Sequence, residues 1–221
     1  MNTSTQVDAF FGQFQAFSFK AEDLIIHAGE KAPIIYYLKS GIVKQSAISQ
    51  QGQESTITFY KPGAFFPLVW AVQDKPVPYD FRAVTNGHGW STSTEKVTAF
   101  LKQNAEVTYE LCLRLLSGLE GMSRKAEFAL QATASLRVRE AILTLAYRFG
   151  NGEEKNLEIE LTLTHHQLAE ITGLSRETVT RELTTLRDQN LIQISNKFFT
   201  IPSLTALEAT LAATPHCLAA V

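Results

Sequence analysis

Short apolar runs alternate with turn residues over residues 22–100, which is the pattern of a β-rich domain. The runs are DLIIHA, IIYYLKS, IVKQSAIS, STITFYK, DFRAVT and WSTST, and the turns lie at Gly29-Glu30, Ser40-Gly41, Gln51-Gly52, Pro62-Gly63 and Asn86-Gly87. Short strands at near-regular spacing are typical of a sandwich or a barrel. Ahead of this domain, Phe10, Phe11 and Phe14 have helical spacing. They predict a short helix within residues 1–20 whose aromatic side chains pack on the β-domain.

Residues 104–131 form a long helical pattern without proline. Two apolar stripes can be drawn along it, one through Leu111, Leu115, Gly118, Met122 and Ala129, the other through Cys112, Leu116, Leu119, Ala126 and Leu130. A helix that is apolar on two sides is buried on two sides. We expect one side to lie on the β-domain and the other to pair with the same helix of a second copy, at roughly heptad spacing. Lys125 interrupts the first stripe, so the pairing face stays open.

The last third of the chain predicts a winged helix-turn-helix. A helix over 133–149, with Thr133 as its cap, precedes the loop NGEEKN, a strand in LEIELTL, two short helices and a hairpin in LIQISNKFFTIP. The hairpin turn at Ser195-Asn196-Lys197 is the expected wing, and SLTALEATLA predicts a last short helix.

The helix-turn-helix itself runs from Thr164 to Leu186. The Thr164 hydroxyl can cap the first helix, and Gly173 ends that helix where a left-handed backbone is favourable. Ser175 caps the second helix, whose buried stripe is Val179, Leu183 and Leu186. In this architecture the second helix enters the major groove of DNA.

A polar arc occupies another face of the second helix. Its members are Arg176, Glu177, Thr180, Arg181 and Thr184. A guanidinium presents paired donors to the O6 and N7 acceptors of guanine, and a carboxylate accepts from the cytosine amino group. We therefore predict that Arg176, Glu177 and Arg181 read bases. The alternative is that Glu177 and Arg181 merely form an i, i+4 ion pair, worth about 0.2–0.5 kcal/mol.

Composition narrows the function classes. At 221 residues the chain is long enough for two domains, and it shows neither a secretory signal nor an apolar run of the roughly 18 residues that a membrane span needs. We therefore expect a cytoplasmic protein without membrane contact. Cys112 and Cys217 lie far apart, which argues against a disulfide, a zinc site or an iron–sulfur cluster. Motifs of the P-loop, GxSxG, HExxH and Rossmann types are missing, so we expect no enzyme activity, metal or cofactor.

Charge restricts how the chain can bind DNA. Its net charge is −2, and residues 132–221 carry eight Lys and Arg against ten Asp and Glu. The footprint of a DNA-binding domain is usually basic. If this chain binds DNA, the positive field must be local, and a long arm that tracks phosphates is not expected.

The order of the elements and their motifs resemble the Crp/Fnr family of bacterial transcription regulators. Residues 25–66 resemble the family's β-roll, and GLSRETVTREL followed by LRDQNLI resembles its recognition helix and the entry to its wing. The resemblance covers nearly the whole chain and implies an α+β fold in three parts. These are an N-terminal double-stranded, cyclic-nucleotide-binding-like β-roll over 1–103, a dimerisation helix over 104–131, and a C-terminal winged helix-turn-helix over 132–221.

The resemblance also implies the DNA site. Arg176, Glu177 and Arg181 match the family's base-reading trio, which implies two inverted TGTGA-like half-sites read by a homodimer through Leu111, Leu115, Leu119 and Met122. Positions near phosphates are matched by Thr164, His165, His166, Ser175, Thr178, Thr180 and Lys197. The two histidines stand where some relatives have a charged or amide donor. Neutral imidazoles give weaker, pH-sensitive contacts; the alternative is that both are plain surface residues.

The effector side departs from the family's cyclic-nucleotide branch. Phe66-Pro67-Leu68 replaces a Gly-Glu-Leu turn, and Arg82 is offset from the Arg-Ser-Ala segment that holds phosphate there. We therefore expect an effector that is unknown and not a cyclic nucleotide. Candidate pocket residues are Phe66, Leu68, Trp70, Tyr79, Phe81, Arg82, Met122 and Ser123, unless they form a filled core. A haem sensor would need an axial ligand, for which His88, expected in a turn, is the candidate.

The alternative to a sensor is a ligand-independent regulator whose β-roll serves only as a scaffold. The resemblance makes RNA polymerase an expected partner, because the loop NGEEKNLE lies where relatives contact it.

Overall fold

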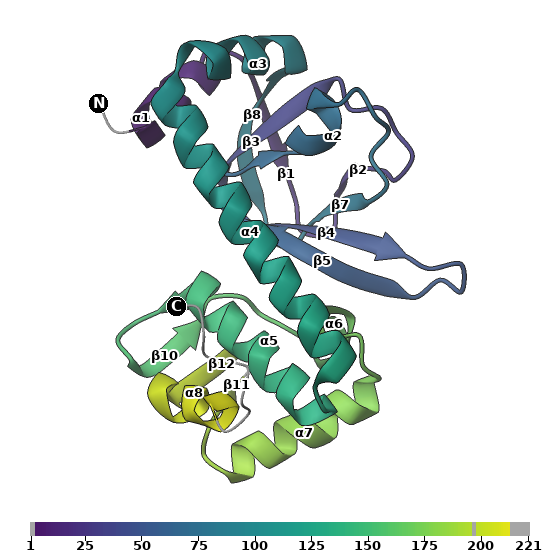
Figure 1. Ribbon diagram of the computed structural model, residues 1–221, viewed down its shortest axis with the longest axis vertical. Helices are drawn as coiled ribbons and strands as arrows, with labels where there is room; N and C mark the ends of the chain where they lie inside the picture. The colour runs from purple at the N-terminus through teal and green to yellow at the C-terminus, as the bar shows by residue number, and fades with distance from the viewer. Residues whose placement is uncertain (1–2, 196–197, 213–221) are drawn as a thin grey trace. The chain divides into compact units, whose positions relative to one another are not determined.

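The computed structural model describes residues 3–195 and 198–212 (Figure 1). The chain divides into two compact units between Glu120 and Gly121. Helix α4 (Ala105–Gln131) is continuous across this division, so its first part belongs to one unit and its last part to the other. The expected domain limits at 103 and 131 stay predictions.

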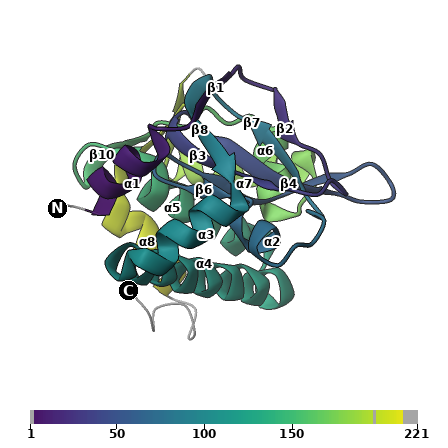
Figure 2. The same ribbon diagram turned by 90° about the horizontal axis from the view of Figure 1, so that it is seen from above.

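Two antiparallel four-stranded sheets form the body of the first unit. One has the order β1-β8-β3-β6 and the other β2-β7-β4-β5. The strands are β1 (Gln15–Phe19), β2 (Leu24–Ile26), β3 (Ile34–Ser40), β4 (Val43–Ile48), β5 (Glu54–Tyr60), β6 (Phe65–Phe66), β7 (Asp80–Ala83) and β8 (Gly87–Ser93). Helices α1 (Thr3–Phe11) and α3 (Thr94–Gln103) pack beside β8, as Figure 2 shows from above. The expected β-roll is confirmed.

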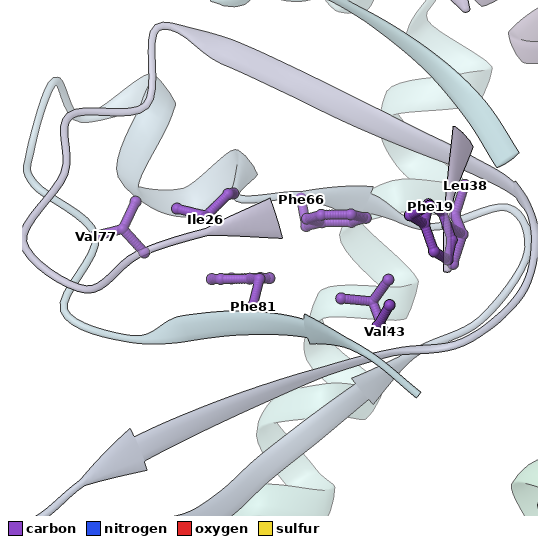
Figure 3. Close-up of a cluster of buried hydrophobic side chains, with 8 residues drawn as sticks. Phe19, Ile26, Leu38, Val43, Phe66, Val77 and Phe81 are labelled. Atoms are coloured by element: carbon purple, nitrogen blue, oxygen red, sulfur yellow. The ribbon is translucent and has the colours of Figure 1, made fainter. Parts of the chain in front are cut away.

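Alternation along β3 divides the apolar residues of this unit between two clusters. Leu38 lies in the cluster between the sheets, whereas Ile35 and Tyr37 lie in the one under the helices, because neighbouring strand residues point to opposite faces. The cluster between the sheets consists of Phe19, Ile26, Leu38, Val43, Phe66, Val77, Phe81 and Ala83 (Figure 3). Its rings stack closely, with the centroids of Phe66 and Phe81 5.4 Å apart.

The N-terminal aromatic residues do not all belong to a helix. Helix α1 ends at Phe11, and Phe17 lies in β1, where it is paired with Gly89 of β8. Phe10 packs as predicted, with its ring stacked on Phe100 of α3 at 4.0 Å between centroids. The expected short helix is therefore present as α1, although Phe14 lies beyond its end. The strand β1 that follows was not predicted, and the alternation of polar and apolar residues in QAFSF was its sequence signal.

The second unit is a small sheet with helices packed on it. Its sheet has the order β11-β12-β10-β9. The elements are α5 (Ala134–Phe149), β9 (Gly150–Asn151), β10 (Lys155–Ile159), α6 (His165–Thr172), α7 (Arg176–Asp188), β11 (Gln193–Ser195), β12 (Phe198–Ser203) and α8 (Leu204–Ala212). The strand expected in LEIELTL begins earlier and ends at Ile159. Among the described residues, no helix is both long and apolar enough to cross a membrane.

Candidate nucleic-acid interface

A complete capping box starts α6. The amide of Gln167 donates to the Thr164 hydroxyl at 3.1 Å, and the Thr164 amide donates back to the Gln167 side-chain oxygen at 2.9 Å. This reciprocal pair satisfies two donors that the first turn of a helix cannot satisfy itself. Thr164 therefore fixes where α6 begins.

A left-handed glycine ends α6. Gly173 has φ of +64°, a backbone conformation that glycine adopts without strain. Its amide and that of Leu174 both donate to the carbonyl oxygen of Ala169, at 2.8 and 3.2 Å. The chain then turns directly into Ser175, whose hydroxyl accepts from the Thr178 amide at 3.2 Å and caps α7.

Helix α7 has a buried stripe and an exposed polar arc. Val179, Leu183 and Leu186 are buried in the core of the second unit. The exposed residues of the arc are those expected from the sequence, namely Arg176, Glu177, Thr180, Arg181 and Thr184. Burial of one stripe thus leaves two guanidiniums and a carboxylate on the open side of the helix.

Glu177 is charged and held by the N-terminus of its own helix. Its pKa is lowered because its carboxylate accepts from its own backbone amide and from the Ser175 hydroxyl, with a further contribution from the charge of Arg176. Arg181 pairs with the adjacent Glu182, with Nε 3.5 Å from Oε1. The Glu177 carboxylate and the Arg181 guanidinium therefore each contact another group, and not each other as in the i, i+4 ion pair considered above.

The two histidines at the start of α6 point to different partners. His165 Nδ1 lies 2.9 Å from the hydroxyl of Thr180 on α7, and His166 Nδ1 lies 2.9 Å from the Glu170 carboxylate. The Thr180 hydroxyl itself donates to the Arg176 carbonyl at 2.8 Å, so it accepts from His165. His165 is thus a bridge between the two helices, a role that the sequence did not suggest.

Several expected phosphate contacts already have partners. The Thr164 hydroxyl lies 3.1 Å from the Gln167 side-chain oxygen, and Ser175 and Thr178 share a hydrogen bond of 3.0 Å between their hydroxyls. Lys197 lies outside the described residues, as does Asn196 at the tip of the expected wing.

The expected effector residues are mostly packed. Phe66 and Phe81 are fully buried in the cluster between the sheets (Figure 3). Trp70 and Tyr79 pack against this cluster, which favours the filled core. Leu68, in the short helix α2 (Leu68–Val72), packs in the other cluster. The Arg82 guanidinium donates to the Glu22 carbonyl at 2.9 Å. On α4, Met122 and Ser123 are exposed.

His88 lies in a strand and not in a turn. It is the second residue of β8, paired with Ser40 of β3, and its Nδ1 lies 2.6 Å from the Ser40 hydroxyl. The prediction that His88 lies in a turn was wrong. Gly87 and Gly89 do not mark a turn but allow β8 to pack closely against Ser40 and Tyr37 of β3. A Cβ on Gly89 would lie 2.1 Å from the Tyr37 carbonyl oxygen.

Two family descriptions match the chain in order. Residues 16–104 match the cyclic nucleotide-binding domain, and residues 136–210 match the Crp-like helix-turn-helix domain. The first region contains both sheets of the first unit, and the second contains α6 and α7.

Similar proteins over most of the chain are named as transcription regulators. The global nitrogen regulator of Synechocystis sp. is 29% identical over 196 residues, which cover 86% of this chain and 85% of the relative. The cAMP-activated global transcriptional regulator CRP of Pasteurella multocida is 25% identical over 202 residues, covering 89% and 96%. A solved CRP/FNR-family regulator from Thermus thermophilus superposes with a TM-score of 0.73 at 25% identity, over 90% of this chain and 98% of that one. The chain therefore belongs to the Crp/Fnr family of transcription regulators.

Proposed function

We propose that the protein is a cytoplasmic, homodimeric regulator that reads two inverted TGTGA-like half-sites with α7. The observation that carries this proposal is the exposed arc of Arg176, Glu177 and Arg181 on a helix whose opposite stripe is buried. Both guanidiniums have the donor geometry for guanine, and the charged carboxylate of Glu177 is an acceptor for the cytosine amino group.

Phosphate contacts surround this arc in the proposal. Thr164 and Thr180 must release the Gln167 oxygen and the Arg176 carbonyl before their hydroxyls can donate to a phosphate. The Ser175 hydroxyl donates to Glu177, so Thr178 donates to Ser175, and both hydroxyls must also release these partners before they can donate to a phosphate. His165, His166 and Lys197 complete the set. Because residues 132–221 carry more acidic than basic side chains, we expect a shallow dependence of affinity on salt.

Dimerisation through α4 is the second part of the proposal. The stripe of Cys112, Leu116, Leu119, Ala126 and Leu130 is exposed throughout, with Leu119 61% and Leu130 84% accessible. On the other side of the helix Val107 and Phe128 are buried, and burial lowers the pKa of Lys125, which faces Glu140. This contrast favours the second stripe as the pairing seam. Leu111, half-buried, lies off it, and Leu115 and Met122 flank it.

The nature of the effector separates two forms of the proposal. The filled space between the sheets favours a ligand-independent regulator whose β-roll is a scaffold for dimerisation and for RNA polymerase. A sensor for a small molecule other than a cyclic nucleotide is the other form. Thermal unfolding with cyclic AMP and a metabolite panel distinguishes them, because a ligand that binds only the folded state raises the transition temperature.

The experiment that tests the proposed function is equilibrium binding of the full-length protein to labelled duplexes. We expect tight binding to two inverted TGTGA half-sites about one helical turn apart, weaker binding to one half-site, and the weakest binding to a scrambled duplex. Equal affinity for all three would contradict the proposal.

A further inference from the structure

Arg137 of α5 reaches the turn between α6 and α7, although it lies 35 residues away in the sequence. Its Nη2 donates to the carbonyl oxygen of Thr172 and, at 3.4 Å, to that of Gly173. These carbonyls stand at the end of α6, where the helix offers them no amide partner. The guanidinium also meets the negative end of the α6 dipole, so the contact is electrostatically favourable.

The absence of a side chain at Gly173 leaves room for the Arg137 guanidinium beside the turn. A Cβ on Gly173 would lie 3.0 Å from the Arg137 Nη2, so a side chain there would displace it. The amides of the turn are fixed separately, because those of Gly173 and Leu174 both donate to Ala169. Arg137 therefore supplies the partner for the carbonyl side of the turn.

We propose that Arg137 is a positioning residue for base reading. By holding the Thr172 and Gly173 carbonyls, it sets the direction in which α7 leaves the turn, and so the place of Arg176 and Glu177, without touching DNA. Two residues separate Gly173 from Arg176, and Ser175 is already fixed as the cap of α7. A change in the turn is therefore transmitted to the first turn of α7. This inference rests on the proposed function.

Three variants isolate the contact. Arg137→Met keeps the length of the side chain and removes its donors. Arg137→Lys keeps the charge but offers one ammonium in place of a planar fork, so we expect partial recovery. Arg148→Met is the matched control, because it removes the same charge from the last turn of α5, where the Arg148 guanidinium lies 5.7 Å from the Phe149 ring centroid.

The measurement is binding of each full-length variant to a duplex with two inverted TGTGA half-sites and to a scrambled duplex, over a range of salt, at a temperature where circular dichroism shows all variants folded. Arg137→Met should lose about tenfold in affinity for the matched duplex, comparable with one mismatched base pair. Its affinity for the scrambled duplex should change by less than about twofold. Arg148→Met should resemble the wild type on both duplexes.

The salt dependence separates positioning from direct contact. Loss of one phosphate contact reduces the slope of log affinity against log salt by about 0.9, and we expect no such reduction in Arg137→Met. A reduction of that size, an equal loss on both duplexes, or no loss would overturn the inference. A wild type that does not discriminate between the duplexes would overturn the proposed function and this inference with it. If the wild type discriminates between the two duplexes and Arg137→Met discriminates equally well, the inference is overturned and the proposed function stands.

Discussion

A base-reading side chain must keep its donors and acceptors at the surface in a fixed place. Helix α7 meets this need by burying a different set of residues, so Arg176 is exposed one position after the cap Ser175. The cap hydroxyl serves a second purpose, because it also donates to the Glu177 carboxylate and lowers its pKa. Ser175 thus caps the helix and, after the backbone amide of Glu177, contributes to the lowered pKa of a group that we propose reads bases.

Replacement of Arg176 by alanine should weaken binding to the matched duplex by about 1–3 kcal/mol and relax the preference at one base pair per half-site, because the paired donors to guanine are lost. Arg187→Ala is the control on the same helix, since Arg187 is exposed near its end and pairs with Asp188 at 3.5 Å. Competition binding with single-base variants of the site measures both effects. An unchanged preference at every position in Arg176→Ala would show that Arg176 does not read a base.

A second prediction at the scale of residues concerns the contact between His27, which follows the last residue of β2, and Asp80, the first residue of β7. His27 Nδ1 lies 2.9 Å from Asp80 Oδ1, and this hydrogen bond and the Asp80 charge raise the pKa of His27. Burial alone would raise the pKa of Asp80, but the hydrogen bonds from the Ala28 amide and from His27 lower it. The ionised pair therefore stabilises the fold at pH values between 3.8 and 6.5, which are the pKa values of Asp80 and His27 in the unfolded chain.

Because the pKa of His27 is raised in the folded state, its contribution is complete below pH 6.5 and is lost as pH rises through the folded value. The free energy of unfolding of the wild type should therefore exceed that of His27→Gln by more at pH 5.5 than at pH 8.5. Chemical denaturation at both pH values measures this, with His88→Gln as the control for loss of an exposed histidine. Parallel pH profiles for wild type and His27→Gln would rule out the charged pair.

At the scale of elements, α4 presents an unusual surface for a helix in water. Exposed Leu116, Leu119 and Leu130 share one stripe, whereas Val107 and Phe128 are buried on another side. An exposed apolar surface of this kind marks an interaction site. Its roughly heptad spacing is that of a helix that pairs with a second helix.

Leu119→Glu should convert the dimer to a monomer at micromolar concentration, because it places two charges opposite each other in the seam. The control is Leu113→Glu, which changes an exposed leucine of the same helix that lies off the stripe. Sedimentation velocity distinguishes the two states. If Leu119→Glu sediments as a dimer while remaining folded, α4 does not pair through this stripe.

The turns of the β-roll offer a matched pair of glycines. Gly41 and Gly52 have φ of +86° and +79°, so alanine is strained at both, by about 1–2 kcal/mol. A Cβ on Gly41 would also lie 2.8 Å from the Asn86 carbonyl oxygen, whereas one on Gly52 would meet nothing within 4 Å. Gly41→Ala should therefore lower the free energy of unfolding by at least about 1 kcal/mol more than Gly52→Ala. If urea denaturation shows that both substitutions lower the free energy of unfolding equally, the close approach of Gly41 to the Asn86 carbonyl oxygen is contradicted.

Local sequence signals predicted the elements whose causes are local. The caps Thr164 and Ser175, the stop at Gly173 and the stripe of Val179 depend on residues within a few positions, and the structure has them as expected. The strand β1 and the strand position of His88 depend on pairing with distant strands. The first was therefore not predicted, and the two glycines that flank His88 were wrongly taken as a turn. Arg137 is the extreme case, because its partners lie on a helix far along the sequence.

At the scale of the whole molecule, specificity must come without a net positive charge. The chain has a net charge of −2, and its DNA-binding unit is itself acidic on balance. Non-specific attraction to phosphates is therefore weak, and we expect most of the affinity for a site to come from base contacts of α7 and from the use of two half-sites by a dimer.

The most direct measurement is selection of bound duplexes from a random pool by the purified full-length protein. We expect enrichment of two inverted TGTGA-like half-sites with their centres about one helical turn apart. For Arg176→Ala, we expect that enrichment is lost at one base pair in each half-site. Selection of no common sequence, or of a single asymmetric site, would contradict the claim that a symmetric pair of α7 helices reads the DNA.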